Sequence, residues 1–110
     1  MKYKLMIVDD ERRIRQGIAC SCNWEELGIA EVIQVENGLD AYQKLKEDPV
    51  NIILSDIVMP EIDGLMLAEI VRREFPDILF YLLTGYSEFE YARRALQNGV
   101  RNYILKPSED

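Results

Sequence analysis

Residues 4–10 have the sequence KLMIVDD, an apolar run that stops at two aspartates. A near-continuous apolar run of this length is typical of a β-strand that is covered on both faces. Four further runs follow with helix-like segments between them, so the predicted strands are residues 4–8, 30–35, 51–54, 78–83 and 102–105. This alternation predicts an α/β fold, a doubly wound, five-stranded parallel sheet with helices on both faces.

The segments between the strands have the spacing of amphipathic helices. The third helix should end near Phe75, because the proline that follows disfavours helical backbone before it. The pair Ser87 and Glu90 has the spacing of a capping box and predicts the start of the fourth helix. Only three residues follow Pro107, so the final helix of such a fold is expected to be missing from this chain. The expected inward-facing residues are Ile14, Ile18 and Cys22; Ala41, Tyr42 and Leu45; Leu67, Ile70 and Val71; and Phe89, Ala92 and Leu96.

Length and composition limit the class of protein. With 110 residues, 48% of them hydrophobic, the chain can build one compact core, so we expect a single domain over residues 1–110. The formal net charge of -7 argues against direct binding to nucleic acid, which relies on clustered Lys and Arg. No apolar run approaches the roughly 20 residues of a membrane-spanning helix, so no membrane partner is expected.

Cys20 and Cys22 lie two residues apart in the first predicted helix, and the chain contains no histidine. Two divergent thiols without histidine offer too few ligands for zinc. We therefore expect reduced cysteines with a structural role, which suits a cytoplasmic protein.

Polar residues follow four of the predicted strands directly. In parallel sheets the carboxyl ends of the strands meet at one edge, where ligands bind. Three carboxylates at this edge would repel one another without a cation, and Mg²⁺ suits such an all-oxygen site. An ionised aspartate can accept a phosphoryl group, while a lysine and a hydroxyl can hold the phosphoryl oxygens. The residues concerned are Asp9 and Asp10, Ser55 and Asp56, Thr84 and Gly85, and Lys106 and Pro107.

Each of these residues also has an ordinary structural interpretation. Asp9 and Asp10 could cap the first helix, where acidic side chains interact well with the helix dipole. Asp56 could be a loop residue, Thr84 a turn residue and Lys106 a solvated strand end. Because all of them follow successive strands at the same edge, the joint interpretation as a phosphoryl-transfer site is favoured.

These residues lie in stretches that resemble the response-regulator receiver domains of two-component signalling, and the resemblance covers the whole chain. The matching stretches are IVDDE at 7–11, DIVMP at 56–60, DG at 63–64, LTG at 83–85 and LKP at 105–107. The resemblance implies a flavodoxin-like strand order of 2-1-3-4-5. It also implies a switch that accepts a phosphoryl group from a sensor histidine kinase and catalyses its own modification, without being a turnover enzyme.

The resemblance assigns a role to each matching position. Asp56 corresponds to the phosphoacceptor. Asp10 corresponds to a direct Mg²⁺ ligand and Asp9 to one that acts largely through water, and the Val58 main-chain carbonyl is a further ligand. The remaining assignments are Lys106 as the phosphate-sensing lysine, Thr84 and Tyr103 as the switch residues, Gly85 in the loop after Thr84, and Pro107 after a cis peptide bond.

Two segments, residues 23–28 (NWEELG) and 85–92 (GYSEFEYA), are similar to receivers joined to an AraC-type helix-turn-helix output domain. This similarity implies a C-terminal DNA-binding output domain in the full-length protein, absent from this chain. The resemblance to the receiver family as a whole implies homodimerisation on phosphorylation. The alternative for Trp24 and Leu27 is that they simply bury the end of the first helix.

Three other functions are compatible with parts of the pattern. A phosphatase of the haloacid-dehalogenase type needs a second carboxylate two residues after its nucleophile, and that position is Val58. A flavodoxin-like electron carrier needs a phosphate-binding loop where this chain has Asp9 and Asp10. A pseudo-receiver that serves only as an interaction module would not need the complete set of Asp, Thr and Lys residues.

Overall fold

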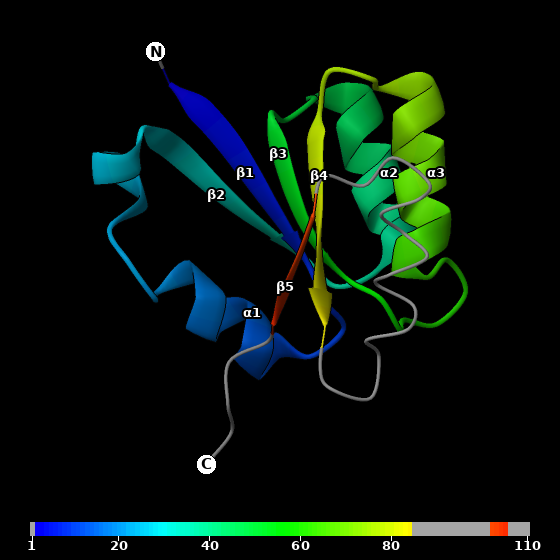
Figure 1. Ribbon diagram of the computed structural model, residues 1–110, viewed down its shortest axis with the longest axis horizontal. Helices are drawn as coiled ribbons and strands as arrows, with labels where there is room; N and C mark the ends of the chain where they lie inside the picture. Colours follow the sequence, from blue (N-terminus) through cyan, green and yellow to red (C-terminus); the bar gives the residue numbers. More distant parts are fainter. Residues whose placement is uncertain (1, 85–101, 106–110) are drawn as a thin grey trace.

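The computed structural model describes residues 2–84 and 102–105, with Thr84 and residues 102–105 described by their main chain alone. Five parallel strands form one sheet in the order β2-β1-β3-β4-β5, which confirms the expected fold class and strand order (Figure 1). The strands are β1 (Tyr3–Val8), β2 (Ile29–Val35), β3 (Ile52–Asp56), β4 (Leu79–Thr84) and β5 (Asn102–Leu105). Strand β3 extends two residues beyond its predicted end, because Ser55 and Asp56 pair with β4.

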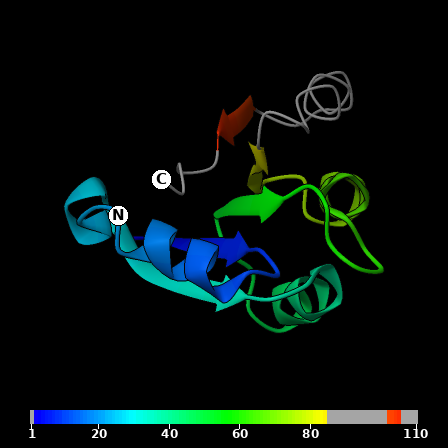
Figure 2. The same cartoon turned by 90° about the horizontal axis from the view of Figure 1, so that it is seen from below.

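The helices lie on both faces of the sheet. They are α1 (Arg12–Ala19), a short 3-10 helix η1 (Trp24–Leu27), α2 (Gly38–Glu47) and α3 (Gly64–Glu74). Figure 2 shows α1 on one face and α2 and α3 on the other. Because helices cover both faces of the sheet, the side chains on both sides of each inner strand are buried. This explains why the strand sequences are almost continuously apolar. Among the described residues, no helix is long and apolar enough to cross a membrane.

Two apolar clusters hold these layers together. Ile14 and Ile18 of α1 pack on Leu5 and Ile7 of β1, and on the other face α2 and α3 pack on residues such as Met6. Met6 and Ile7 are completely buried. Each fully buried side chain of this size contributes roughly 1.5–3 kcal/mol relative to exposure, so the packing of β1 stabilises the fold strongly.

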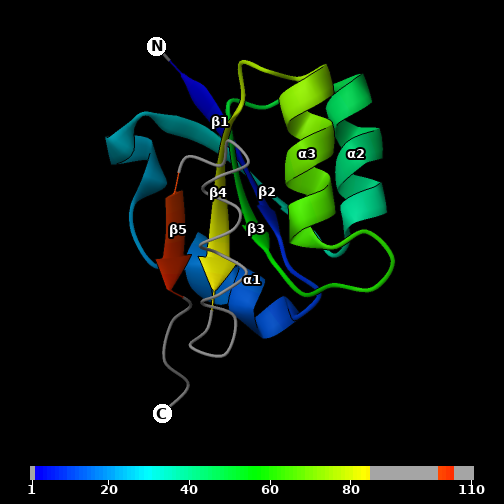
Figure 3. The same ribbon diagram turned by 45° about the vertical axis from the view of Figure 1, so that its right-hand side comes forward.

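Helices α2 and α3 lie side by side (Figure 3). Tyr42 of α2, an expected inward-facing residue, is half-buried, and its hydroxyl donates to Glu74 Oε1 at 2.7 Å. This hydrogen bond raises the pKa of Tyr42. Its ring also packs edge-on against Phe75, the C-cap of α3, which confirms the predicted helix end near this residue.

The end of α1 differs from the prediction. The helix stops at Ala19, so Cys22 is not the third residue of its buried stripe, and both cysteines are exposed free thiols. The indole Nε1 of Trp24, five residues further on, donates to the Ala19 carbonyl at 3.0 Å and so satisfies a carbonyl that the helix leaves unpaired at its end. Trp24 is half-buried as the structural alternative required, but Leu27 is 65% exposed, so that interpretation is wrong for Leu27.

Candidate functional site

Three carboxylates gather where β1 ends. Asp9 is fully buried, whereas Asp10 and Glu11 are exposed, and each offers an oxygen within 4.8 Å of the other two. The main chain fixes Asp9, because its N–H donates to the Val35 carbonyl at 3.1 Å and Glu11 N–H donates to its Oδ1 at 2.9 Å. Glu11 was not predicted as a site residue, although its place directly after two aspartates could have indicated it.

Asp56 is the last residue of β3, the strand next to β1. Val8 pairs with Ser55, so Asp9 and Asp56 are the next residues at the same edge of the sheet. Asp56 is only 2% exposed, and its Oδ1 accepts a hydrogen bond from Ile57 N–H at 2.9 Å. Two buried carboxylates at neighbouring strand ends repel each other strongly, and a cation placed between them removes that repulsion.

The donor atoms at this edge fit Mg²⁺. Asp9, Asp10 and Glu11 bring carboxylate oxygens within 4.8 Å of one another, the ligand type that hard divalent cations prefer, and Asp56 at the next strand end is not part of this group. Mg²⁺ usually keeps several waters, so a site with a few carboxylates does not need a complete protein cage. The edge therefore has the chemistry of a magnesium site.

The loop after Asp56 is held by close backbone packing. Gly64 N–H donates to the Ile57 carbonyl at 2.7 Å, and a Cβ at Gly64 would lie 2.1 Å from the Asp56 carbonyl oxygen. Asp63 caps α3 by accepting from Met66 N–H at 2.8 Å. Within this loop Val58 is 57% exposed. The first turn of α3 thus sits directly against the end of β3 and fixes the course of the loop.

Glu61 in the same loop has a φ of 66°, the left-handed region that L-residues adopt at a cost of about 1 kcal/mol or more. It lines an acidic cavity of about 250 Å³ together with Asp10, Glu36 and Asp40. We expect Glu61→Gly to be about 1 kcal/mol more stable in urea unfolding than Glu61→Ala, because only glycine adopts this conformation without strain. Both variants lose the same carboxylate, so equal stability would show that the backbone at 61 carries no strain.

The other predicted site residues lie at or beyond the limits of the described chain. The main chain of Thr84 ends β4 and pairs with Leu105, the last residue of β5, so these strand ends meet the same edge as Asp56. Tyr103 lies on β5, where its main chain pairs with Leu82. The side chains of Thr84 and Tyr103 lie outside the described residues, as do Gly85, Lys106, Pro107 and its peptide bond.

Residues 5–110 match the family model of the response regulator receiver domain. The chain is 40% identical over 108 residues to the uncharacterized transcriptional regulatory protein YesN of Bacillus subtilis, covering 98% of this chain and 29% of that protein. It is 36% identical over 106 residues to the response regulator protein VraR of Staphylococcus saprophyticus, covering 96% of this chain and 50% of that protein. The chain therefore spans half or less of the length of these two relatives.

Solved structures of similar fold point to the same family. The receiver domain of AraT, a response regulator from Geobacillus stearothermophilus, has a TM-score of 0.91 and 37% identity, covering 98% of this chain and 84% of that one. A two component transcriptional regulator AraC from Clostridium phytofermentans has a TM-score of 0.88 and 31% identity, again covering 98% of this chain and 84% of that one. These relatives are named as regulators rather than turnover enzymes. The chain belongs to the family of response regulator receiver domains.

Proposed function

We propose that this domain is a phosphorylation-dependent signalling switch that accepts a phosphoryl group from a sensor histidine kinase onto Asp56. The observation that carries the proposal is the buried Asp56 carboxylate at the end of β3, beside the acidic cluster that ends β1. Receiver domains typically bind Mg²⁺ through such an acidic cluster. The complete set of acidic residues favours this function over a pseudo-receiver.

In the proposed reaction an Asp56 carboxylate oxygen attacks the phosphorus of a phosphohistidine. The new bond is an acyl phosphate O–P bond, and the P–N bond breaks as its electron pair returns to the histidine nitrogen. Mg²⁺ bound here would supply positive charge that stabilises the phosphoryl oxygens. The metal ion would be held by the carboxylates of Asp9, Asp10 and Asp56 and by the main-chain carbonyl of Val58. Asp56 needs no general base, because its carboxylate attacks as the anion, the form that a bound cation favours.

Residues of β4, β5 and the segments that follow them complete the proposal. Lys106 and the Thr84 hydroxyl bind the phosphoryl oxygens, and the new phosphoryl group adds about -1 to -2 of charge to the site. Tyr103 then turns inward as Thr84 moves, while Gly85 and a cis bond before Pro107 shape the two loops. Contacts that exist only in the phosphorylated state shift a two-state equilibrium of the surface.

The proposed setting is a cytoplasmic transcriptional regulator. Residues 1–110 form the receiver domain, and a DNA-binding output domain of the AraC type lies elsewhere in the full-length protein. The names of YesN and of the AraC-type structural relative support this output. The formal net charge of -7 leaves nucleic acid to that output domain. Phosphorylation would promote homodimerisation.

Intact-mass measurement after incubation with acetyl phosphate tests the function. We expect one phosphoryl adduct in the presence of Mg²⁺ and none when the metal is removed by a chelator, because the carboxylates repel the incoming anion without it. Phosphorylated protein at equal levels with and without metal would contradict the magnesium site. A protein that forms no adduct from acetyl phosphate or from a phosphorylated kinase would contradict the switch itself.

A further inference from the structure

Arg15 of α1 contacts the acidic cluster through the main chain rather than through its carboxylates. Its Nη1 donates to the carbonyl oxygen of Asp9 at 2.7 Å, a short hydrogen bond from a charged donor. The carbonyl belongs to the peptide unit that joins Asp9 to Asp10. A fixed carbonyl fixes the plane of this peptide, and with it the direction in which the Asp10 side chain leaves the backbone.

The main chain of the same residue holds the other end of the segment. Arg15 N–H donates to the Glu11 carbonyl at 3.1 Å, the first hydrogen bond of α1. Arg15 therefore contacts the chain at both ends of this segment, with its side chain at the Asp9 carbonyl and its main chain at the Glu11 carbonyl. The side chains of Asp10 and Glu11 leave the backbone between these two contacts, and that of Asp9 leaves it just before the first one.

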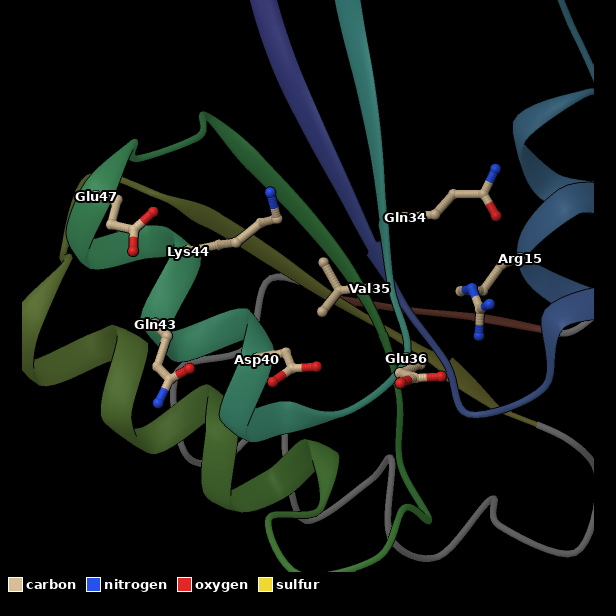
Figure 4. A pocket seen from close by; sticks show the side chains of 8 residues that line it. All are labelled: Arg15, Gln34, Val35, Glu36, Asp40, Gln43, Lys44 and Glu47. Carbon is tan, nitrogen blue, oxygen red and sulfur yellow. The ribbon is translucent and has the colours of Figure 1, made fainter.

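The surroundings of Arg15 show that this contact is preferred over ion pairing. Figure 4 shows Arg15 facing Glu36 across a cavity of about 400 Å³ that Asp40 and Glu47 also line. Within residues 2–84 and 102–105, Arg15 forms no ion pair, and its buried Nε has no hydrogen-bond partner. An unsatisfied buried N–H costs free energy, so the contact with Asp9 must offset it.

We propose that Arg15 is a positioning residue, which holds the Asp9–Asp10 peptide so that the carboxylates converge on Mg²⁺. This inference rests on the proposed function, because it assumes the magnesium site. Residues that orient metal ligands without touching the metal commonly change its affinity by about 10- to 100-fold when they are replaced.

Charge and position predict opposite effects for Arg15→Gln. A guanidinium beside the cluster repels a divalent cation, so loss of its charge alone would tighten Mg²⁺ binding. Loss of the contact with the Asp9 carbonyl would loosen the peptide and weaken binding. If positioning dominates, the dissociation constant should rise about tenfold in spite of the more favourable charge.

Calorimetric titration with Mg²⁺ alone, without any phosphodonor, measures this effect. The matched control is Arg12→Gln, which removes the same charge from the exposed first turn of the same helix. We expect Mg²⁺ affinity that is unchanged or tighter for Arg12→Gln and weaker for Arg15→Gln. Equal or tighter binding by a folded Arg15→Gln protein would overturn the proposal.

A second measurement uses the wild-type protein and needs no variant. The ¹⁵N signals of the Arg15 guanidinium should shift when Mg²⁺ is added, because a cation bound by the carboxylates changes the electric field at the peptide whose carbonyl accepts from Arg15. Signals that stay in place at saturating Mg²⁺ would overturn the proposal. A wild type that binds no Mg²⁺ would overturn the magnesium site as well, whereas normal Mg²⁺ binding without phosphorylation would contradict the proposed function alone.

Discussion

An Asp56→Asn variant is expected to form no phosphoryl adduct with acetyl phosphate and Mg²⁺, where the wild type forms one. The amide of asparagine is not an anionic nucleophile, so the acyl phosphate cannot form. The side chain has nearly the same shape, and its Oδ1 can still accept from Ile57 N–H, a bond of 2.9 Å in the wild type. The variant should also be at least as stable, because one of two neighbouring buried charges has been removed.

Asp63→Asn provides the matched control for this experiment. Asp63 caps α3 in the loop after Asp56, and asparagine is an equally good N-cap residue. We expect this variant to keep the adduct at the level of the wild type, as seen by intact mass and by peptide mapping. An adduct that persists in Asp56→Asn would place the phosphoacceptor at another carboxylate of the acidic edge.

Gly64→Ala is expected to lower the free energy of unfolding by about 3 kcal/mol or more, at the upper end of overpacking effects. The added Cβ would lie 2.1 Å from the Asp56 carbonyl oxygen and 2.9 Å from the Ile57 Cα. Both are main-chain atoms, which cannot rotate away as the tip of a side chain could. The first turn of α3 would have to leave β3, and the loop beside Asp56 would move with it. Urea unfolding monitored by circular dichroism measures the loss.

Gly17→Ala is the opposite case in the same protein. Gly17 lies in α1, and a Cβ there would meet nothing within 4 Å. Alanine favours helix over glycine by about 0.5–1 kcal/mol, so this variant should be more stable than the wild type. If Gly64→Ala were as stable as Gly17→Ala, the close approach of α3 to β3 would be easily relaxed and would not hold the loop.

Features that depend on neighbouring residues could be predicted from the sequence. The apolar runs predicted the strands to within two residues at each end, because burial on both faces demands apolar residues throughout. Pro76 predicted the end of α3 at Phe75 through a local steric clash. The acidic edge followed from the rule that parallel strands present their carboxyl ends together. Asp9 and Asp56 were therefore assigned to one site before their burial was known.

Features that depend on contacts of side chains and loops with the main chain were decided by the tertiary structure alone. Helix α1 ends at Ala19, where the carbonyl accepts from the Trp24 indole, and no helical periodicity predicts this end before Cys22. The left-handed backbone of Glu61 and the contact of Gly64 with β3 depend on how the loop packs. The contact of Arg15 with the Asp9 carbonyl depends on how α1 lies on the sheet. The sequence by itself predicted which residues would carry the chemistry, whereas only the tertiary structure decided what holds them in place, because contacts of side chains and loops with the main chain leave no pattern in the order of side chains.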